Sequence, residues 1–387
     1  METQAAYDLA PIAHIALVGL LLALAPLAWV WSRNRGATLA QRLAALSLLT
    51  LFLTFDLVLF GAFTRLTDSG LGCPDWPGCY GNASPLGARH EIAAAQSAMP
   101  TGPVTHGKAW VEMVHRYLAT GVGVLIIVLA VTSWVAARKG HLQVSPWWAT
   151  FTLGWVCLQG AFGAWTVTMK LYPAIVTGHL LGGLGLLMLL AAQAQGYRPQ
   201  PVHMSRSLYA GVLAVFGLIV VQVTLGGWVS TNYAVLACSD FPSCQGGYWP
   251  PMDFEEGFTV LRPLGQSQDG GYLSFAALTA IHYTHRLMAY LVLAATVVLA
   301  WRLHATGATA LRRWAIALLV VAAWQLLSGL ANVVLGWPLV AAVAHTAGAA
   351  AWVTLLTVLV VRARQGARFP ATKLASAPHR GSVSLTT

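Results

Sequence analysis

Charged side chains are scarce in this chain of 387 residues, and their scarcity excludes the commonest class of protein. Asp, Glu, Lys and Arg together make up only 9% of the residues, whereas 57% are hydrophobic. A soluble globular domain carries about 25% charged residues, and the mean hydropathy here is +0.66. We therefore exclude a soluble domain and expect a membrane protein.

Apolar runs long enough to cross a bilayer core of about 30 Å occur nine times. They lie at residues 12–31, 44–64, 109–136, 147–167, 174–195, 208–229, 274–302, 314–336 and 339–361. The first run follows Glu2 and Asp8 and has no clean small-residue cleavage site after it, which favours an uncleaved anchor over a signal peptide. We predict an all-α polytopic membrane protein with about nine spans.

Basic residues indicate how the spans are oriented, because Lys and Arg gather on the cytoplasmic side. On one side lie 15 of the 22 basic residues: Arg33, Arg35, Arg42, Arg138, Lys139, Arg198, Arg206, Arg302, Arg312, Arg313, Arg362, Arg364, Arg368, Lys373 and Arg380. We expect an outside N-terminus, a cytoplasmic C-terminus and a disordered basic tail at 362–387. The net charge of +10 follows mostly from this bias and requires no nucleic acid.

The opposite side holds two long loops, 65–108 and 230–273, which contain four of the five cysteines. Each loop has one pair six positions apart: Cys73 with Cys79, and Cys238 with Cys244. Paired cysteines on the outer side indicate disulfides, because that compartment is oxidising. Zinc is a poor alternative, because each loop offers two thiols and no further Cys or His at ligand spacing.

The chain repeats itself at an offset of about 165 residues. The cysteines give 238 − 73 = 165 and 244 − 79 = 165, and the histidines give 285 − 115 = 170 and 345 − 179 = 166. Such offsets indicate an internal duplication. We predict an anchor segment, 1–43, then two four-helix bundles, 44–195 and 208–361, joined by the linker 196–207. An even number of spans per unit places a pseudo-twofold axis along the membrane normal.

Four histidines occupy similar depths toward the outer side of their spans: His115, His179, His285 and His345. A hydrogen-bonded neutral imidazole explains any one of them equally well, but four in related pairs indicate a functional site. Haem iron takes two axial imidazoles from facing helices. Small neighbours would let a porphyrin approach the backbone, although they also serve ordinary helix packing; they include Gly121, Gly182, Gly185 and Gly348.

Two arginines and one carboxylate stand beside these histidines. Arg116 and Arg286 directly follow two of them and are candidates for gripping haem propionates; the alternative is that they extend toward the outer headgroups. One turn earlier the first half has Glu112 where the second has His282. The carboxylate is a candidate proton donor, proton acceptor or oxygen nucleophile, and the alternative is a structural salt bridge.

Together these motifs resemble the haem A synthases, a bacterial family related to the mitochondrial haem A synthase of cytochrome oxidase assembly. The resemblance covers about residues 50–361. It rests on Thr64-Arg65-Leu66-Thr67, Ser69-Gly70-Leu71, the Cys73/Cys79 loop, Glu112-Met113-Val114-His115-Arg116, His179, His285-Arg286 and His345. It implies two four-helix bundles related by a pseudo-twofold axis.

The resemblance also implies site residues. A haem b cofactor is expected between His285 and His345, and the substrate, haem O, at His115 and His179. Glu112 is expected to be needed for the reaction, and the Cys73–Cys79 pair to be tied to it through redox chemistry or haem transfer. Arg65 joins the candidate propionate contacts.

The implied function is oxidation of a methyl group of haem O to a formyl group, through a hydroxymethyl intermediate, which gives haem A. The implied partners are a haem O synthase as substrate donor, a terminal oxidase or its assembly factors as haem A acceptor, membrane lipid, and a quinone or another electron acceptor. A homo-oligomer is compatible with this reading. The implied location is the bacterial inner membrane, with the cysteine loops on the periplasmic side.

Two features depart from the family pattern. The run 12–31 is additional to eight helices, and we treat it as an appended anchor. His282 is an alternative ligand to His285, although the offset and the His-Arg pairing favour His285. Two rival functions explain the four histidines equally well: a di-haem b-type cytochrome in quinol electron transfer, and a haem transporter or chaperone. The cytochrome does not explain a carboxylate in one half only.

Overall fold

The computed structural model of the protein describes residues 10–140 and 144–368. Within these ranges the long helices are α1 (Ala10–Arg33), α2 (Leu39–Leu66), α4 (His106–Arg138), α5 (Pro146–Thr168), α6 (Pro173–Tyr197), α7 (Arg206–Thr231), α9 (Phe275–Ala305), α10 (Thr309–Val334) and α11 (Leu339–Arg368). The described residues form no strand and only isolated β-bridges. The all-α prediction is confirmed.

Each predicted apolar run coincides with a long helix, but eight helices of the described part of the chain, not nine, are both long and apolar enough to be candidate spans. The exception is α5, whose 23 residues include four Trp, four Thr and Gln159 in place of aliphatic side chains. At the other end, α11 continues to Arg368, so the start of the predicted disordered tail is helical. The rest of that tail, with Lys373 and Arg380, lies outside the described residues, as do Glu2 and Asp8.

Local sequence explains where most of these helices begin. The hydroxyls of Thr38, Thr105, Ser205 and Ser274 accept hydrogen bonds from backbone N–H groups in the first turns of α2, α4, α7 and α9. Pro146 and Pro173 occupy the first positions of α5 and α6, where a missing N–H costs nothing. The start of each helix is therefore set by one or two residues.

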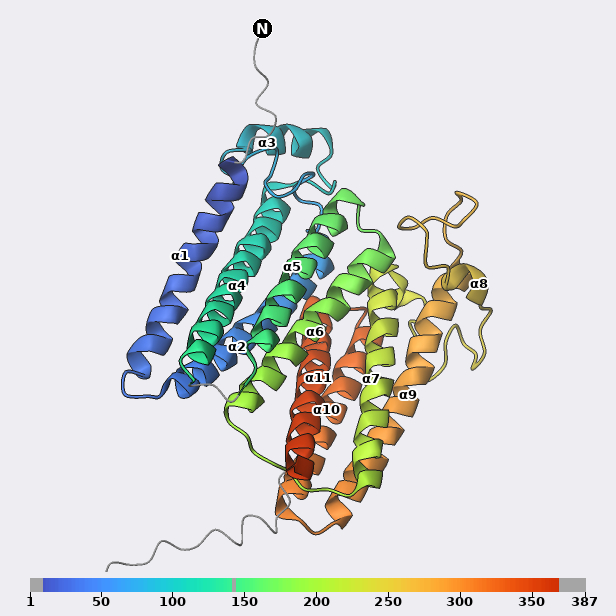
Figure 1. Cartoon of the computed structure of the whole chain (residues 1–387). Helices are drawn as coiled ribbons and strands as arrows, with labels where there is room; N and C mark the ends of the chain where they lie inside the picture. Colours follow the sequence, from blue (N-terminus) through green and yellow to red (C-terminus); the bar gives the residue numbers. More distant parts are fainter. Residues whose placement is uncertain (1–9, 141–143, 369–387) are drawn as a thin grey trace, which may run out of the picture.

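The helices associate in two groups of four (Figure 1). In the first half, α2, α4, α5 and α6 contact one another in a closed cycle, and in the second half α7, α9, α10 and α11 do the same. The halves meet where α6 packs on α7 and α11, and α2 on α11. One buried apolar cluster continues across this junction, from Leu184 and Leu187 of α6 into all four helices of the second half.

The first helix is more than an appended anchor, because it packs along α4 (Figure 1). Gly19 lies so close to α4 that an added Cβ would stand 2.4 Å from the Thr120 side chain. Near its start, Ile15 joins a buried cluster that contains Cys73 and Cys79. The helix therefore covers the first half and touches the loop that carries the first cysteine pair.

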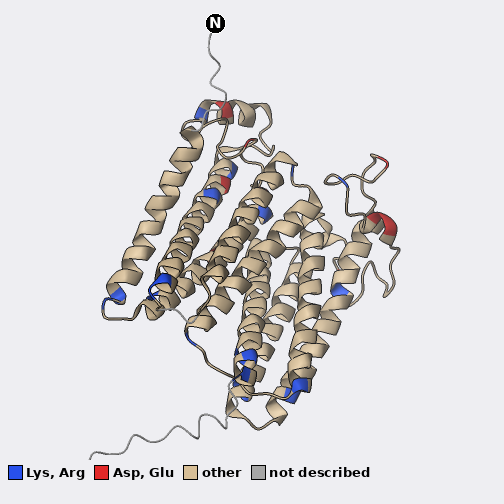
Figure 2. Cartoon of the chain, viewed as in Figure 1, with Lys and Arg blue, Asp and Glu red and all other residues tan. Residues whose placement is uncertain are grey.

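The two long loops lie at the same end of the molecule and carry short helices: α3 (Arg89–Ala98) in the first, and η1 (Ala234–Leu236) and α8 (Phe254–Gly257) in the second. Figure 2 shows acidic residues at this end, in α3 and α8, and basic residues gathered at the opposite ends of the helices. This separation of charge agrees with the bias of Lys and Arg in the sequence.

Candidate functional site

Both predicted cysteine pairs form disulfides, Cys73–Cys79 and Cys238–Cys244. All four cysteines are fully buried. In each loop the second cysteine exchanges backbone hydrogen bonds with the residue three positions on, Asn82 or Gly247. The disulfide prediction is confirmed, and the two loops have the same local fold.

An aspartate closes each of these disulfide loops. The Asp75 carboxylate accepts the N–H groups of Tyr80 and Gly81 at 2.6 and 2.7 Å. At the matching position, 240 − 75 = 165, Asp240 accepts those of Gln245 and Gly246 at 2.8 and 3.0 Å. The hydroxyl of Ser243 and these N–H groups lower the pKa of Asp240 to about 2.

Arg116 and Arg286 lie beneath the disulfide loops and donate into them. Arg116 Nη1 donates to the carbonyls of Asp75, Pro77 and Gly78 at 2.6–3.0 Å. Arg286 donates to the carbonyls of Asp240, Ser243 and Cys238 at 2.7–3.2 Å. The loop carbonyls thus accept hydrogen bonds from the two guanidinium groups that we considered for haem propionates or for the outer headgroups. Propionate binding by these arginines stays a prediction.

Glu112 is buried in α4 and connects the first disulfide loop to Arg116. Its Oε2 accepts the N–H of Cys73 at 2.8 Å, and its Oε1 forms an ion pair with Arg116 at 2.5 Å. The salt bridge that we held as the alternative reading therefore exists, and the carboxylate also binds the backbone of the disulfide.

His282, at the matching position of α9, makes a different connection. It is buried, and its Nδ1 lies 3.0 Å from the carbonyl of Ala234 in η1, to which it can donate. At this position the two halves thus differ in the side chain, a carboxylate or an imidazole, and in the segment that it binds, the disulfide loop or η1.

The four histidines lie on α4, α6, α9 and α11 and interact in pairs. His115 lies near His179, and His285 lies near His345. Each residue is only partly buried, yet Nδ1 of His115, His179 and His285 is buried without a hydrogen-bond partner. The exposed surface of these three residues therefore belongs to atoms other than Nδ1. No cluster of three or more His, Cys, Asp or Glu suited to a metal occurs among the described residues.

A glycine faces each of these imidazoles from the neighbouring helix. A Cβ added at Gly61, Gly226 or Gly329 would stand 2.9–3.2 Å from the ring of His115, His285 or His345, and one at Gly163 would stand 3.6 Å from His179. The glycines repeat like the histidines, with 226 − 61 = 165 and 329 − 163 = 166. Each histidine ring therefore lies where the opposite helix has no side chain.

Sequence reasoning missed these glycines and singled out others. Gly121 faces α1, while Gly182 and Gly348 each face a glutamine of the neighbouring helix, and Gly185 faces Trp155. The glycines that we associated with a porphyrin thus serve helix packing, the alternative considered above. Gly61 and Gly163 recur at the repeat offset as Gly226 and Gly329, and this recurrence is the sequence signal that could have drawn attention to them.

Arg65 lies at the end of α2 and joins the two halves. It donates to the carbonyl of Ser230 at 2.6 Å and lies over the ring of Tyr233, 4.0 Å from its centroid. It also pairs with Asp68 at 3.4 Å. A propionate contact by Arg65 stays a prediction.

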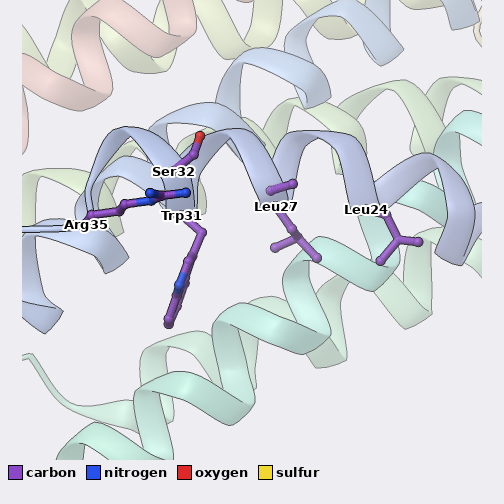
Figure 3. Close-up of a pocket in the computed structure, with 6 residues that line it drawn as sticks. Leu24, Leu27, Trp31, Ser32 and Arg35 are labelled. Atoms are coloured by element: carbon purple, nitrogen blue, oxygen red, sulfur yellow. The ribbon is translucent and has the colours of Figure 1, made fainter.

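An open cavity of about 590 Å³ lies along α1 and its following turn. It is lined by Leu24, Leu27, Ala28, Trp31, Ser32 and Arg35 (Figure 3). None of the four histidines lines it, so this cavity is not part of the site described above.

These residues fit iron porphyrin. Each half has two imidazoles within one four-helix group, each ring is packed against a glycine, and Nδ1 of three of the four rings has no protein partner. Haem iron takes two such imidazoles from the helices of a bundle. Two imidazoles without a third protein ligand suit a haem, which supplies the other four nitrogens itself, better than a structural zinc site.

The chain is similar to known proteins of one family. Residues 41–359 match the family described as cytochrome oxidase assembly protein (COX15-CtaA). The haem A synthase of Shewanella oneidensis is 38% identical over 317 residues, 81% of this chain and 93% of that protein. The haem A synthase of Dinoroseobacter shibae is 28% identical over 86% of this chain and 89% of its own length. The chain therefore belongs to the COX15-CtaA family, in which its relatives are haem A synthases.

Proposed function

We propose that this protein is a haem A synthase that oxidises a methyl group of haem O to the formyl group of haem A. The family membership and the two histidine pairs support this function. The observation that carries it is the carboxylate of Glu112, which the second half replaces with His282. A protein that only passed electrons between two haems would not need a buried carboxylate beside one of them.

Haem O binds in the first half, where His115 and His179 hold its iron. Replacing the methyl group by a formyl group with oxygen from water releases four electrons and four protons: CH3 plus H2O gives CHO, 4 e⁻ and 4 H⁺. The hydroxymethyl intermediate lies after the first two electrons. Glu112 accepts a proton in these steps. To do so, its carboxylate gives up its hydrogen bond with Arg116 or with the Cys73 N–H.

The Cys73–Cys79 disulfide acts on the reaction through Glu112. The N–H of Cys73 fixes one carboxylate oxygen, and Arg116 links the other oxygen to the loop carbonyls. Any change in the loop therefore moves the carboxylate. This connection is absent in the second half, where His282 binds η1.

His285 and His345 would hold haem b as the resident cofactor of the second half. When bound, it supplies a route by which electrons leave the first half toward a quinone or another acceptor. His285 is favoured over His282 as the ligand, because its ring lies opposite Gly226, as the ring of His115 lies opposite Gly61.

The two halves are related by a pseudo-twofold axis, and side chains at equivalent positions support this proposal. Arg65 donates to Ser230 and Tyr233 donates to Asp68, and both pairs are 165 positions apart. Toward the other end of the helices, the N–H of Gln200 donates to Gln365, again 165 positions away. Equivalent residues meet only close to a twofold axis, so these contacts support an axis that runs along the helices.

Placement in the cell follows from the charge distribution. The basic ends of the helices face the cytoplasm, and the disulfide loops face the periplasm of a bacterial inner membrane. In this arrangement a haem O synthase delivers the substrate through the membrane, and a terminal oxidase or its assembly factors receive haem A.

Pigment analysis tests the function. We would purify the wild-type chain, Glu112→Gln and the matched control His282→Gln from cells that make haem O, and identify the extracted haems by mass. The wild type is expected to contain haem O, its hydroxylated form or haem A beside haem b. Glu112→Gln should keep haem b and lower conversion by about a hundredfold or more, whereas the control converts. Two results together would contradict the proposal: the wild type contains haem b alone, and Glu112→Gln leaves haem A formation unchanged.

A further inference from the structure

The second half supports one of its histidines with a hydrogen bond that the first half lacks. Nδ1 of His345 lies 2.9 Å from the hydroxyl of Ser328 on α10. That hydroxyl donates its only hydrogen to the carbonyl of Trp324 at 2.7 Å. With its hydrogen on that carbonyl, the oxygen of Ser328 can accept from Nδ1–H of His345, and in this tautomer the lone pair of Nε2 is free for iron.

The matching position of the first half is Phe162. The offset of 166 that relates His345 to His179 and Gly329 to Gly163 also relates Ser328 to Phe162. The register is independently fixed, because Gln159 faces Gly182 as Gln325 faces Gly348. A phenyl ring accepts no such bond, and Nδ1 of His179 is buried without a partner.

The other histidine of each half does not show this difference, because Nδ1 of His285 is buried without a partner, like that of His115. Nε2 of Gln222 on α7 donates to the backbone carbonyl of His285 at 3.2 Å, and the same nitrogen lies 3.4 Å from Nε2 of the ring. Its counterpart in α2, 165 positions earlier, is Leu57, which packs in an apolar cluster. The support of an imidazole Nδ1 thus rests on Ser328 in the second half, where the first half has Phe162.

We propose that Ser328 is a positioning residue that holds haem b permanently in the second half, and that Phe162 leaves the first half able to exchange its haem. This inference rests on the proposed function, which assigns haem b to one half and haem O to the other. A partner on Nδ1–H fixes the ring and makes the imidazole a better donor to iron. Without one, a bound imidazole leaves a buried N–H unsatisfied, which weakens the site. A substrate that leaves after each turnover requires the weaker site.

Haem retention and redox potential test this assignment. We would incubate purified chains with excess apomyoglobin, which captures released haem, and follow haem b and the haem O or haem A pool separately by their spectra. Ser328→Ala should lose haem b about tenfold faster, and the midpoint potential of that haem should rise, because ferric iron loses electron donation. Ser328→Thr keeps the hydroxyl and should restore both properties.

The reciprocal change is made in the first half. Phe162→Ser should slow the release of haem O or haem A, whereas Phe162→Ala makes a similar cavity without a hydroxyl and should not. Wild-type release from Phe162→Ser overturns the inference, and so does a Ser328→Ala chain with wild-type retention and potential. A Ser328→Thr chain that behaves like Ser328→Ala also overturns it, since packing would then be the cause. A wild-type chain that contains no haem overturns the proposed function itself.

Discussion

The two disulfide loops have the same internal structure but different attachments to the helix beneath them. Each is closed by an aspartate and held from below by an arginine. The first is also bound by Glu112, whereas the residue at that position in the second, His282, binds η1 instead. The difference teaches that the two halves share a scaffold and differ at one buried position, which in the first half binds the disulfide loop.

The histidine pairs lead to the same lesson. All four imidazoles are packed against a glycine, so this arrangement is common to both halves. The hydrogen bond from an imidazole Nδ1 to a neighbouring hydroxyl, at Ser328, occurs only in the second half of the described residues. The halves thus share their packing and differ in a few polar side chains.

Removing one histidine from each half should break the comparison most severely. His285→Ala should strongly lower bound haem b, and haem A formation with it, because the iron would keep only one protein ligand, His345. His115→Ala should abolish conversion but leave haem b in place. Haem content by extraction and absorption spectra measure both, with His304→Ala, at the far end of α9, as the control. Loss of haem b from His115→Ala would show that the halves do not bind independently.

Replacing each cysteine pair by serine should separate stability from activity. Both loops close with a sequence separation of six, so each double variant should lose roughly 2 kcal/mol of unfolding free energy. Only Cys73→Ser with Cys79→Ser should also lower haem A formation, by about tenfold, because the N–H of Cys73 positions Glu112. Thermal unfolding and pigment analysis measure the two effects. Equal losses of haem A in both variants would sink this distinction.

Adding a methyl group opposite a histidine should weaken haem binding more where less room is available. At Gly226 the new Cβ would stand 2.9 Å from the His285 ring, and at Gly163 it would stand 3.6 Å from His179. Overpacking of 1–3 kcal/mol predicts about tenfold faster haem loss from Gly226→Ala, and little change from Gly163→Ala. Gly217→Ala, which meets open space in the same helix as Gly226, is the control. Haem release to apomyoglobin measures all three.

Acidification should produce the smallest effect. The pKa of Asp240 is depressed to about 2 in the folded chain, against 3.8 for a free carboxyl. A depressed pKa contributes stability above about pH 3.8, and this contribution disappears as the pH falls toward 2. The difference in thermal stability between the wild type and Asp240→Asn should therefore be constant from pH 7 to 5 and shrink below pH 4. A difference that grows on acidification would contradict this sign.

Periodic and positional features of the sequence were sufficient for the membrane class, the helices and the repeat. Apolar runs locate all nine long helices because a bilayer-length helix needs nearly continuous apolar sequence. The cysteine pairs predicted their disulfides because six positions with Pro inside leave few other outcomes. The apolar run in α5 was long enough for a span, so the prediction counted it with the other eight, although α5 is not among the candidate spans of the structure.

Contacts between helices were decided only by the tertiary structure. Arg116 and Arg286 hold loop carbonyls because folding brings residues some 40 positions earlier above them. The glycines that face the histidines lie on other helices, and no pattern along one helix reveals its partner. The sequence by itself determined which segments are helices and which positions repeat, because both depend on local composition. Which side chains meet was decided by packing, because helices separated in the chain come together only in the folded bundle.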